Sequence, residues 1–331
     1  MRILVTGGAG YVGSHCAKLL TKAGHDVVVL DNLARGHREA VLFGPLIETD
    51  LRDREAVRAA LEQHPVDAVI HFAALAAVGE SMAAPELYFE NNVHGTLNLL
   101  EAMRHHGVDK IVFSSTCATY GIPEEVPILE ATPQNPVSPY GETKLMVEQM
   151  LRWYGTCHGL RWAALRYFNV AGCDPEGELG EEHDPETHLI PLAIDAALGK
   201  RPPLEVFGDD YPTPDGTAIR DYIHVMDLAD AHLKALDYLD KGGKSDAFNL
   251  GTGTGTTVME IVQAVERVTG KPVPRSIGPR RAGDPPALVA SAEKAERILG
   301  WKPTQSDVNS VIETAYAWHK KEIARKAATA E

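Results

Sequence analysis

Short apolar runs alternate with longer amphipathic runs along the first half of the chain. The apolar runs cover Ile3–Thr6, Val27–Leu30, Ala68–Phe72 and Ile111–Ser115, and the amphipathic runs cover Tyr11–Lys22, Arg54–Gln63 and Pro85–His106. This alternation is typical of strand–helix–strand units, which build a parallel sheet with helices on both faces. We therefore predict an α/β fold with a doubly wound parallel sheet.

The pattern changes after Arg166. Glycine, proline and acidic residues are frequent in 172–185, an apolar helix-like run covers Leu189–Leu198, and glycine and proline cluster again in 208–216 and 278–286. Such segments are typical of loops that face a ligand. Because 331 residues exceed the size of one usual hydrophobic core, we predict two lobes. Residues 1–168 with about 221–240 form the first, and residues 169–220 and 241–331 form a second, smaller, substrate-binding lobe.

The net charge of −14 argues against a nucleic-acid partner. Binding a polyanion requires a broad excess of lysine and arginine over the surface. A small anionic ligand needs only a few converging arginines, so this class of ligand stays open.

Cysteine usage and the N-terminus bear on location. The four cysteines, Cys16, Cys117, Cys157 and Cys173, are far apart and form no Cys-x-x-Cys pair, so neither a disulfide framework nor a zinc site is indicated. Met1 and Arg2 lead directly into the first apolar run, which leaves no room for a signal peptide. The longest apolar stretch, 68–78, is far below the ~20 residues of a membrane span. We expect a cytoplasmic protein without a membrane partner.

A glycine-rich segment joins the first predicted strand to the first predicted helix. Gly7, Gly10 and Gly13 have the spacing Gly-x-x-Gly-x-x-Gly, and Gly8 also starts a Gly-x-Gly-x-x-Gly motif. Glycines permit the tight turn and the approach of backbone N–H groups to a pyrophosphate at the positive helix N-terminus. The segment predicts a Rossmann-like dinucleotide site.

Asp31 supports this interpretation. It closes the second predicted strand 18 residues after Gly13, near the ~20 residues expected for an acidic residue that binds the ribose. A carboxylate here repels a 2′-phosphate, so NAD is favoured over NADP. Arg35 and Arg38 are the counter-evidence, since either side chain is long enough to reach such a phosphate.

A second glycine-rich segment covers 251–257 but lacks the lysine that a Walker A phosphate loop requires before its Ser or Thr. We interpret it as a strand-to-helix turn in which a threonine caps the helix.

The segment from Ser138 to Lys144 predicts a catalytic pair. Ser138 has the character of an N-cap and Pro139 of a first helical residue, so a long helix begins here. Tyr140 and Lys144 are four residues apart and share one face. A nearby ammonium stabilises a phenolate and lowers the pKa of the tyrosine, as a general base for a hydroxyl requires.

Thr116 ends the run Ile111–Ser115 with a hydroxyl group. Doubly wound folds bind ligands at the carboxyl ends of their strands. We therefore expect Thr116 to hydrogen-bond a substrate oxygen beside Tyr140.

Taken together, these stretches resemble the extended short-chain dehydrogenase/reductase family, and within it the enzymes that epimerise UDP-sugars at C4. The resemblance covers nearly the whole chain and is carried by His71–Ala74, Val78–Ser81, Asn91–Thr96, Ser138–Gly141, Leu165–Asn169, Phe207–Thr213 and Arg220–Val225. Thr116, Tyr140 and Lys144 match the family's Ser/Thr, Tyr and Lys.

The resemblance implies two sets of ligand contacts. Those to NAD are implied for Gly7, Gly10, Tyr11, Val12, Gly13, Asp31, Asn32, Asp50, Leu51, Phe72, Ala73, Ala74, Asn91, Tyr140, Lys144 and Phe168. Those to a UDP-sugar are implied for Thr116, Tyr140, Asn169, Leu189, Phe207, Arg220, Arg281, Asp284 and Leu288. Arginines suit the diphosphate, and an aromatic face suits the uracil.

The chain departs from the family pattern at three positions. Ala76 stands where many members carry a lysine near the cofactor, Thr116 replaces a commoner serine, and His188 stands where asparagine often lies beside the substrate. Thr116 keeps the hydroxyl group, so the chemistry should be retained. Ala76 and His188 bear on cofactor or sugar preference.

The implied activity is interconversion of UDP-glucose and UDP-galactose through a 4-keto sugar, with NAD tightly bound and regenerated in each turnover. A nucleotide-sugar 4,6-dehydratase is disfavoured, because its Asp-Glu pair is replaced by Cys117 and Ala118. A UDP-pentose 4-epimerase stays open, whereas Leu288, where the family sets the pocket width, hinders an N-acetyl group. A non-enzymatic NAD sensor would not need Thr116, Tyr140 and Lys144.

Two further expectations concern metals and assembly. His183 and His188 are five residues apart in a stretch broken by proline, so they share no helical face and no metal site is predicted. The resemblance implies a homodimer.

Overall fold

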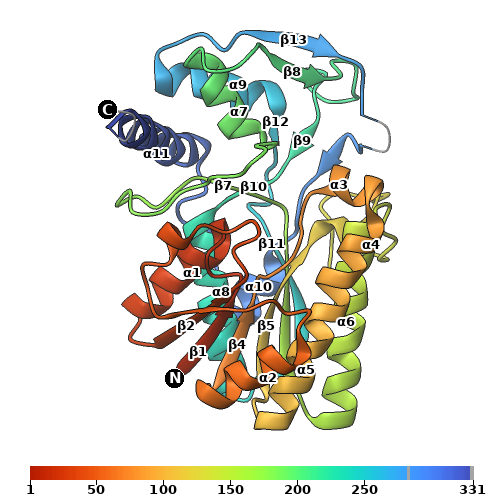
Figure 1. Ribbon diagram of the computed structural model, residues 1–331. Helices are drawn as coiled ribbons and strands as arrows, with labels where there is room; N and C mark the ends of the chain where they lie inside the picture. Colours follow the sequence, from red (N-terminus) through yellow and green to blue (C-terminus); the bar gives the residue numbers. More distant parts are fainter. Residues whose placement is uncertain (282–283, 329–331) are drawn as a thin grey trace.

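The computed structural model describes residues 1–281 and 284–328, and a seven-stranded parallel sheet lies at its centre (Figure 1). The strand order is β11-β6-β5-β4-β1-β2-β3. The strands are β1 (Arg2–Thr6), β2 (Asp26–Asp31), β3 (Leu46–Glu48), β4 (Ala68–His71), β5 (Lys110–Thr116), β6 (Arg161–Tyr167) and β11 (Asp246–Leu250). The predicted doubly wound Rossmann-like sheet is confirmed.

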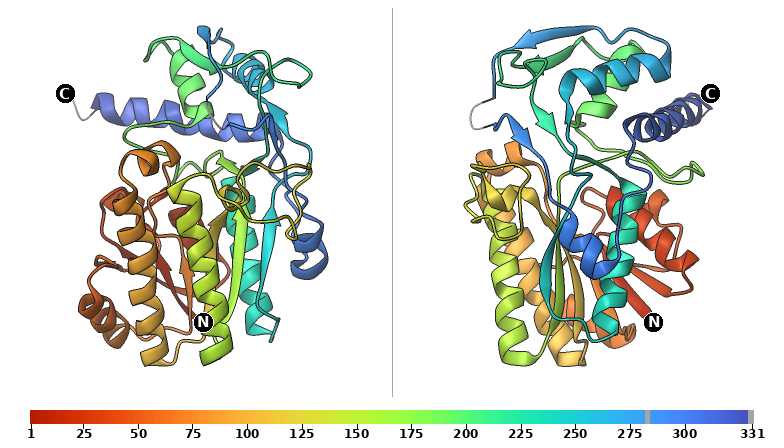
Figure 2. Two further views of the ribbon diagram at one scale, coloured as in Figure 1. Left: turned by 90° about the vertical axis from the view of Figure 1, so that its right-hand side faces the viewer. Right: turned by 180° about the vertical axis from the view of Figure 1, so that it is seen from behind.

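Helices cover both faces of this sheet because alternate side chains of each strand point to opposite faces. On β1, Ile3 and Val5 belong to one buried cluster and Leu4 belongs to another. The first face packs α1 (Tyr11–Lys22) and α8 (Val225–Asp240), and the second packs α2 (Arg54–Gln63), α5 (Gly95–His106) and α6 (Pro139–His158). Figure 2 shows the two helical layers from the side and from behind.

A second group of elements lies beyond the carboxyl ends of the strands (Figure 1). Its helices are α7 (Leu189–Ala197), α9 (Val258–Thr269) and α11 (Val308–Ala328). Its strands are β7 (Asn169–Ala171), β8 (Leu204–Phe207), β9 (Ile219–Arg220), β10 (Tyr222–His224), β12 (Thr256–Thr257), β13 (Arg275–Gly278) and β14 (Ala287–Leu288). These short strands form small sheets of two or three strands.

The remaining helical segments connect or cover these layers. They are α3 (Val78–Ala83), α4 (Pro85–Tyr88), η1 (Arg38–Ala40), η2 (Phe89–His94), η3 (Cys117–Tyr120) and α10 (Glu293–Leu299). The predicted helix over Pro85–His106 is helical throughout, but the middle stretch η2 is a π-helix between α4 and α5.

One part of the predicted lobe division is wrong. Strand β11 pairs in parallel with β6 at the edge of the large sheet, although residues 241–331 had all been placed in the second lobe. Helix α10 also packs on β11 and α8. The sequence-based assignment of residues 221–240 to the first lobe agrees with the packing of α8 on α1.

Side-chain caps define where two of the helices begin. The hydroxyl of Ser138 accepts a hydrogen bond from the amide of Gly141 at the start of α6. Thr257 caps α9 in a reciprocal capping box with Glu260. Both predicted caps are confirmed.

None of the described helices combines the length and the apolar character that a crossing of the lipid bilayer requires.

Candidate functional site

The glycine-rich turn between β1 and α1 leaves no space for side chains. Gly7 has φ +72°, and a Cβ atom there would lie 2.5 Å from the amide nitrogen of Ala73. A Cβ atom on Gly13 would lie 2.2 Å from the carbonyl oxygen of Gly7. Gly10 is the N-cap residue of α1 and supplies no side-chain cap. Amide groups at this helix N-terminus are therefore available to an anion such as a pyrophosphate.

Asp31 lies beside this turn at the end of β2. Its carboxylate accepts hydrogen bonds from the amides of Ala9, at 3.0 Å, and Leu33, at 2.8 Å. Burial raises its pKa, although these backbone hydrogen bonds oppose the shift. Arg35 is paired with Glu80 at 2.6 Å, and Arg38 is paired with Glu48. Both arginines have carboxylate partners, which weakens the argument for a 2′-phosphate.

The other predicted cofactor residues lie around the same edge of the sheet. Tyr11 and Val12 open α1, Asp50 and Leu51 follow β3, Phe72, Ala73 and Ala74 follow β4, Asn91 lies in η2, and Phe168 follows β6. Asn32 donates to Asp50 at 3.0 Å, which links the segments after β2 and β3. Strands β1 and β4 are neighbours, and their junction is the switch point at which doubly wound folds bind dinucleotides. The residues present fit NAD.

Tyr140, Lys144 and Thr116 lie near one another at the carboxyl end of β5. Tyr140 and Lys144 are 8% and 4% exposed. The Lys144 Nζ atom donates to the carbonyl of Ser114 at 2.8 Å and lies 6.0 Å from the centroid of the Tyr140 ring. The Thr116 hydroxyl accepts a hydrogen bond from the amide of Ala118 at 3.1 Å.

The predicted lowering of the Tyr140 pKa is not found in the chain itself. Burial raises the pKa of this phenol well above its ordinary value, and a hydrogen bond with Thr116 offsets only part of the shift. Burial also lowers the pKa of Lys144 to about 7. A lysine of this pKa is charged only in part near neutral pH, so it stabilises a phenolate less than a full positive charge does.

A buried ion pair lies beneath this group and was not predicted from the sequence. Arg166 on β6 pairs with Glu148 on α6 at 2.6 Å. Ser115 also donates to Glu148, at 2.7 Å. Glu148 therefore connects α6 to β6 through Arg166 and to β5, the strand that ends in Thr116, through Ser115. The partners are far apart in sequence, so no local pattern indicated the pair.

Most of the predicted sugar-side residues gather around β8, β9 and β14. Arg220 is paired with Asp284 and donates to the carbonyl of Pro285 at 3.1 Å. The guanidinium of Arg281 lies over the ring of Phe207, at 4.0 Å from its centroid. Leu288 and Arg220 are neighbours in the β9–β14 register. Asn169 and Leu189 come from other elements, since they begin β7 and α7.

Asp221 holds this region together and was also not predicted. Its buried carboxylate accepts from the amides of Thr252, at 2.7 Å, Gly253, at 3.1 Å, and Ala290, at 3.1 Å. The glycine-rich segment after β11 therefore wraps a carboxylate of the protein, which agrees with its interpretation as a structural turn.

His183 and His188 lie close together, although they share no helical face. Their ring centroids are 5.0 Å apart, and Glu181 and Glu186 lie beside them. The segment is an irregular loop that folds back on itself, so helical spacing does not apply to it.

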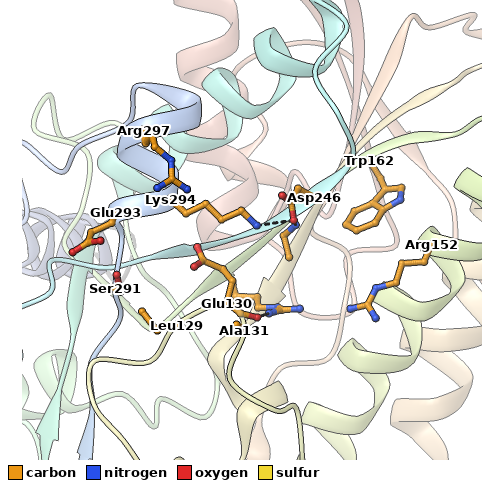
Figure 3. Close-up of a pocket in the computed structure, with 12 residues that line it drawn as sticks. Leu129, Glu130, Ala131, Arg152, Trp162, Asp246, Ser291, Glu293, Lys294 and Arg297 are labelled. Carbon is orange, nitrogen blue, oxygen red and sulfur yellow. Dashed lines mark hydrogen bonds and ion pairs between the residues drawn. The ribbon is translucent and has the colours of Figure 1, made fainter.

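One cavity lies away from the predicted site. It has about 540 Å³ and is lined by residues of the β6–β11 edge and of α10, among them Trp162, Asp246 and Lys294. Figure 3 shows Lys294 paired with Asp246 inside it, and their separation is 2.6 Å. None of the predicted site residues lines this cavity.

Known proteins resemble the chain over nearly its full length. The UDP-glucose 4-epimerase of Lacticaseibacillus casei is 54% identical over 321 residues, which cover 97% of each chain. The crystal structure of UDP-glucose 4-epimerase from Brucella ovis with NAD has a TM-score of 0.94 and 53% identity and covers 96% of this chain and 97% of its own.

A third relative was solved with two ligands. The UDP-glucose 4-epimerase of Stenotrophomonas maltophila, with bound NAD and formylated UDP-arabinopyranose, has a TM-score of 0.95 and 42% identity and covers 98% of this chain and 99% of its own. The sequence pattern of the NAD dependent epimerase/dehydratase family matches residues 3–251. The chain belongs to the NAD dependent epimerase/dehydratase family.

Proposed function

We propose that the chain is an NAD-dependent nucleotide-sugar 4-epimerase that interconverts UDP-glucose and UDP-galactose through a transient 4-keto sugar. The observation that carries this proposal is the burial of Tyr140 and Lys144 at the sheet edge that also bears the Gly7–Gly13 turn. Relatives of 50–54% identity that carry the name UDP-glucose 4-epimerase support the choice of reaction.

The glycine-rich turn and Asp31 hold the cofactor in this proposal. Backbone amides at the start of α1 bind the pyrophosphate, and Asp31 accepts hydrogen bonds from the adenosine ribose. Asn32, Asp50 and Leu51 lie at the adenine end, while Phe72–Ala74, Asn91 and Phe168 line the path to the nicotinamide. Held by these residues, NAD would supply the acceptor, and then the donor, of the hydride at C4 of the sugar.

Tyr140 removes the proton from the C4 hydroxyl and returns it when C4 is reduced. Its phenol is buried and resists ionisation, so the positive charges of Lys144 and of the oxidised cofactor are needed to stabilise the phenolate. Thr116 orients the sugar through its hydroxyl. Burial of all three side chains keeps water from the keto sugar.

The sugar nucleotide lies against β8, β9 and β14. Arg220 and Arg281 bind the diphosphate, Phe207 offers its ring to the uracil, and Leu288 limits the width of the sugar pocket. Asn169, Leu189 and Asp284 complete the contacts. Rotation of the keto sugar about its diphosphate linkage exposes its other face to the returning hydride.

The residues after Thr116 argue against dehydration. Cys117 and Ala118 begin η3, and neither supplies the acid that expels a C6 hydroxyl. Burial raises the pKa of the Cys117 thiol to about 12, so this thiol is a poor proton donor near neutral pH.

We also propose a homodimer that pairs the helical layer of α4, α5 and α6. Large apolar side chains of this layer are exposed, namely Leu87, Leu97 and Trp153, at 41%, 40% and 68%. Figure 2 shows these helices on one outer face. A second copy of the chain would cover these side chains.

A cytoplasmic location completes the proposal. Cys16 and Cys173 are buried as free thiols, which suits a reducing compartment.

The decisive experiment incubates the pure protein, without added NAD, with UDP-galactose, UDP-glucose and UDP-xylose in turn. Equilibration of UDP-glucose with UDP-galactose without lasting NADH supports the proposal. Equilibration of UDP-xylose with UDP-arabinose alone would replace the hexose with a pentose. Loss of water or a lasting NADH signal would overturn epimerisation.

A further inference from the structure

One loop gathers four metal-ligating side chains to which the proposed reaction assigns no step, although one of them, His188, stands where the family often has asparagine beside the substrate. Glu181, His183, Glu186 and His188 precede α7, and their ligand atoms all lie within 4.8 Å of one another. We propose that this cluster binds a divalent transition metal, Zn²⁺, as a structural clamp on the loop.

Four separations between the nitrogen and oxygen donors are close to those of a tetrahedral zinc site. The Nδ1 atom of His183 lies 3.4 Å from both Glu181 Oε1 and Glu186 Oε2. The Nδ1 atom of His188 lies 2.9 Å from Glu181 Oε1 and 3.1 Å from Glu186 Oε1. Zinc bonds of about 2.0–2.1 Å separate tetrahedral donors by about 3.3 Å. The four measured distances bracket this value.

Two of the donor atoms are buried without a hydrogen-bond partner. They are Oε1 of Glu181, whose side chain is only 3% exposed, and Nδ1 of His183. Burying a polar atom of this kind costs free energy unless it is hydrogen-bonded, paired or bound to a metal. A dication between the four side chains supplies a partner for both atoms.

The competing arrangement consists of ion pairs alone. His188 Nδ1 also lies within hydrogen-bond distance of Glu186 Oε1, at 3.1 Å. With both imidazoles protonated, the ring centroids are 5.0 Å apart and their like charges repel each other. The distances from Glu181 to the histidines are short, yet no aligned hydrogen bond reaches its Oε1 atom. One dication balances two carboxylates without placing like charges side by side.

The choice of metal follows from the donors. Imidazole and carboxylate groups together suit zinc, whereas calcium and magnesium favour oxygen ligands alone. The side chain of His188 is 53% exposed, which gives an ion a path from solvent to a cluster in which Glu181 is buried and His183 and Glu186 are half-buried.

The metal would fix the loop against the dinucleotide side of the molecule. The ring of His183 meets that of Tyr11 edge to face, with centroids 6.1 Å apart. Arg35 donates to the carbonyl of Asp184 at 3.3 Å, and His37 Nε2 lies 3.1 Å from the carbonyl of Glu182. The clamped loop therefore rests on the segments that follow β1 and β2.

The test is metal binding by the full-length protein with its cofactor bound. The protein is treated with EDTA, dialysed and titrated with Zn²⁺ by calorimetry, and its metal content and thermal unfolding are measured. We expect one Zn²⁺ per chain and a rise in the unfolding midpoint that EDTA reverses. Glu181→Gln and His188→Gln should each weaken binding at least tenfold, whereas the control His158→Gln, at an exposed histidine outside the cluster, should not.

Absence of Zn²⁺ uptake by the wild-type protein would overturn the proposal, and this result does not depend on the folding of any variant. Equal uptake by folded Glu181→Gln, His188→Gln and wild-type proteins would place the ion elsewhere and would also overturn it. Zn²⁺ binding should persist in an inactive Tyr140→Phe variant, so the metal site and the epimerase activity can fail separately.

Discussion

At the dinucleotide side, the groups proposed to bind the pyrophosphate are backbone amides of one continuous turn, Gly7–Gly13. At the sugar side the groups proposed to meet the ligand are side chains from β8, β9, β14 and the segment before β14, which are distant in sequence. The turn is closely packed, because an added Cβ atom at Gly7 or Gly13 would meet backbone atoms.

The arginines of the sugar side already have partners. Arg220 is paired with Asp284, and Arg281 lies on Phe207. In the proposed binding mode a diphosphate competes with Asp284 for the guanidinium of Arg220, and only the difference between the two ion pairs contributes to affinity. A closely packed backbone site therefore suits a cofactor that remains bound through many turnovers. Side chains that already have partners within the protein suit a substrate that dissociates after each turnover.

We expect the largest loss of activity from substitution of Tyr140, where the dinucleotide side and the sugar side meet. Tyr140→Phe removes the group that transfers the C4 proton, so the rate of UDP-galactose conversion should fall about 10²–10⁴-fold. The NAD content should be unchanged. Tyr154→Phe, on the same helix α6, is the control and should keep the rate. Full activity of Tyr140→Phe would remove the basis of the mechanism.

A second change tests the rigidity of the turn. In Gly13→Ala the new Cβ atom would lie 2.2 Å from the carbonyl oxygen of Gly7, and such overpacking costs about 1–3 kcal/mol. Both the free energy of unfolding in urea and the bound NAD should decrease. Gly79→Ala is the matched control, since nothing lies within 4 Å of its added Cβ atom. Equal effects of the two changes would show that the turn is not special.

A substitution on the sugar side should change substrate binding without changing the bound NAD. Arg220→Lys keeps the charge but loses the planar fork that binds phosphate oxygens, so KM for UDP-galactose should rise about tenfold, or about 1.4 kcal/mol. Bound NAD should not change. Arg267→Lys, on α9, is the control. A loss of NAD in Arg220→Lys would contradict the separation of the two sides.

The smallest effect concerns acid stability on the dinucleotide side. His71 is buried on β4, where its ring nitrogens lie 2.6 Å from the Thr6 hydroxyl and 2.8 Å from the Thr96 hydroxyl. Burial lowers its pKa from 6.5 to about 3, so the unfolded chain takes up a proton that the folded chain refuses. Its contribution to stability is present above pH 6.5 and is lost as the pH falls toward 3.

The expected loss from His71 is about 1 kcal/mol between pH 6.5 and 5.5. Urea unfolding at the two pH values should show a smaller decrease for His71→Gln than for the wild type. An equal decrease in both proteins would mean that His71 does not contribute. A control at exposed His158 should leave the wild-type decrease unchanged.

The sequence predicts those elements whose signals are local. The bounds of α1 and α2 agree with their amphipathic runs, because periodicity and caps lie within the segments themselves. Strand β3 was not predicted, since it has three residues and follows Gly44 and Pro45. The place of β11 was wrong because pairing with β6 is a tertiary contact that no local pattern encodes.

The candidate site divides in the same way. Tyr140, Lys144 and the glycines of the turn were predicted from motifs in continuous sequence. The Glu148–Arg166 pair and the Asp221 carboxylate were not, because their partners are distant along the chain. The Glu181–His188 cluster lies within eight residues, and helical geometry was the wrong rule for a loop that folds back.

The path of the chain restricts how the molecule opens. The polypeptide leaves the large sheet after β6, returns with α8 and β11, leaves again at β12, returns with α10 and ends in α11. Rotation of the large sheet with its helices against the second group of elements must therefore bend several connections at once. Wide hinge opening, in contrast, usually involves only a few residues. We therefore expect only small opening motions between these two parts. Such motions are wide enough to exchange a sugar nucleotide between them, yet too narrow to release a dinucleotide that lies across the carboxyl ends of the strands.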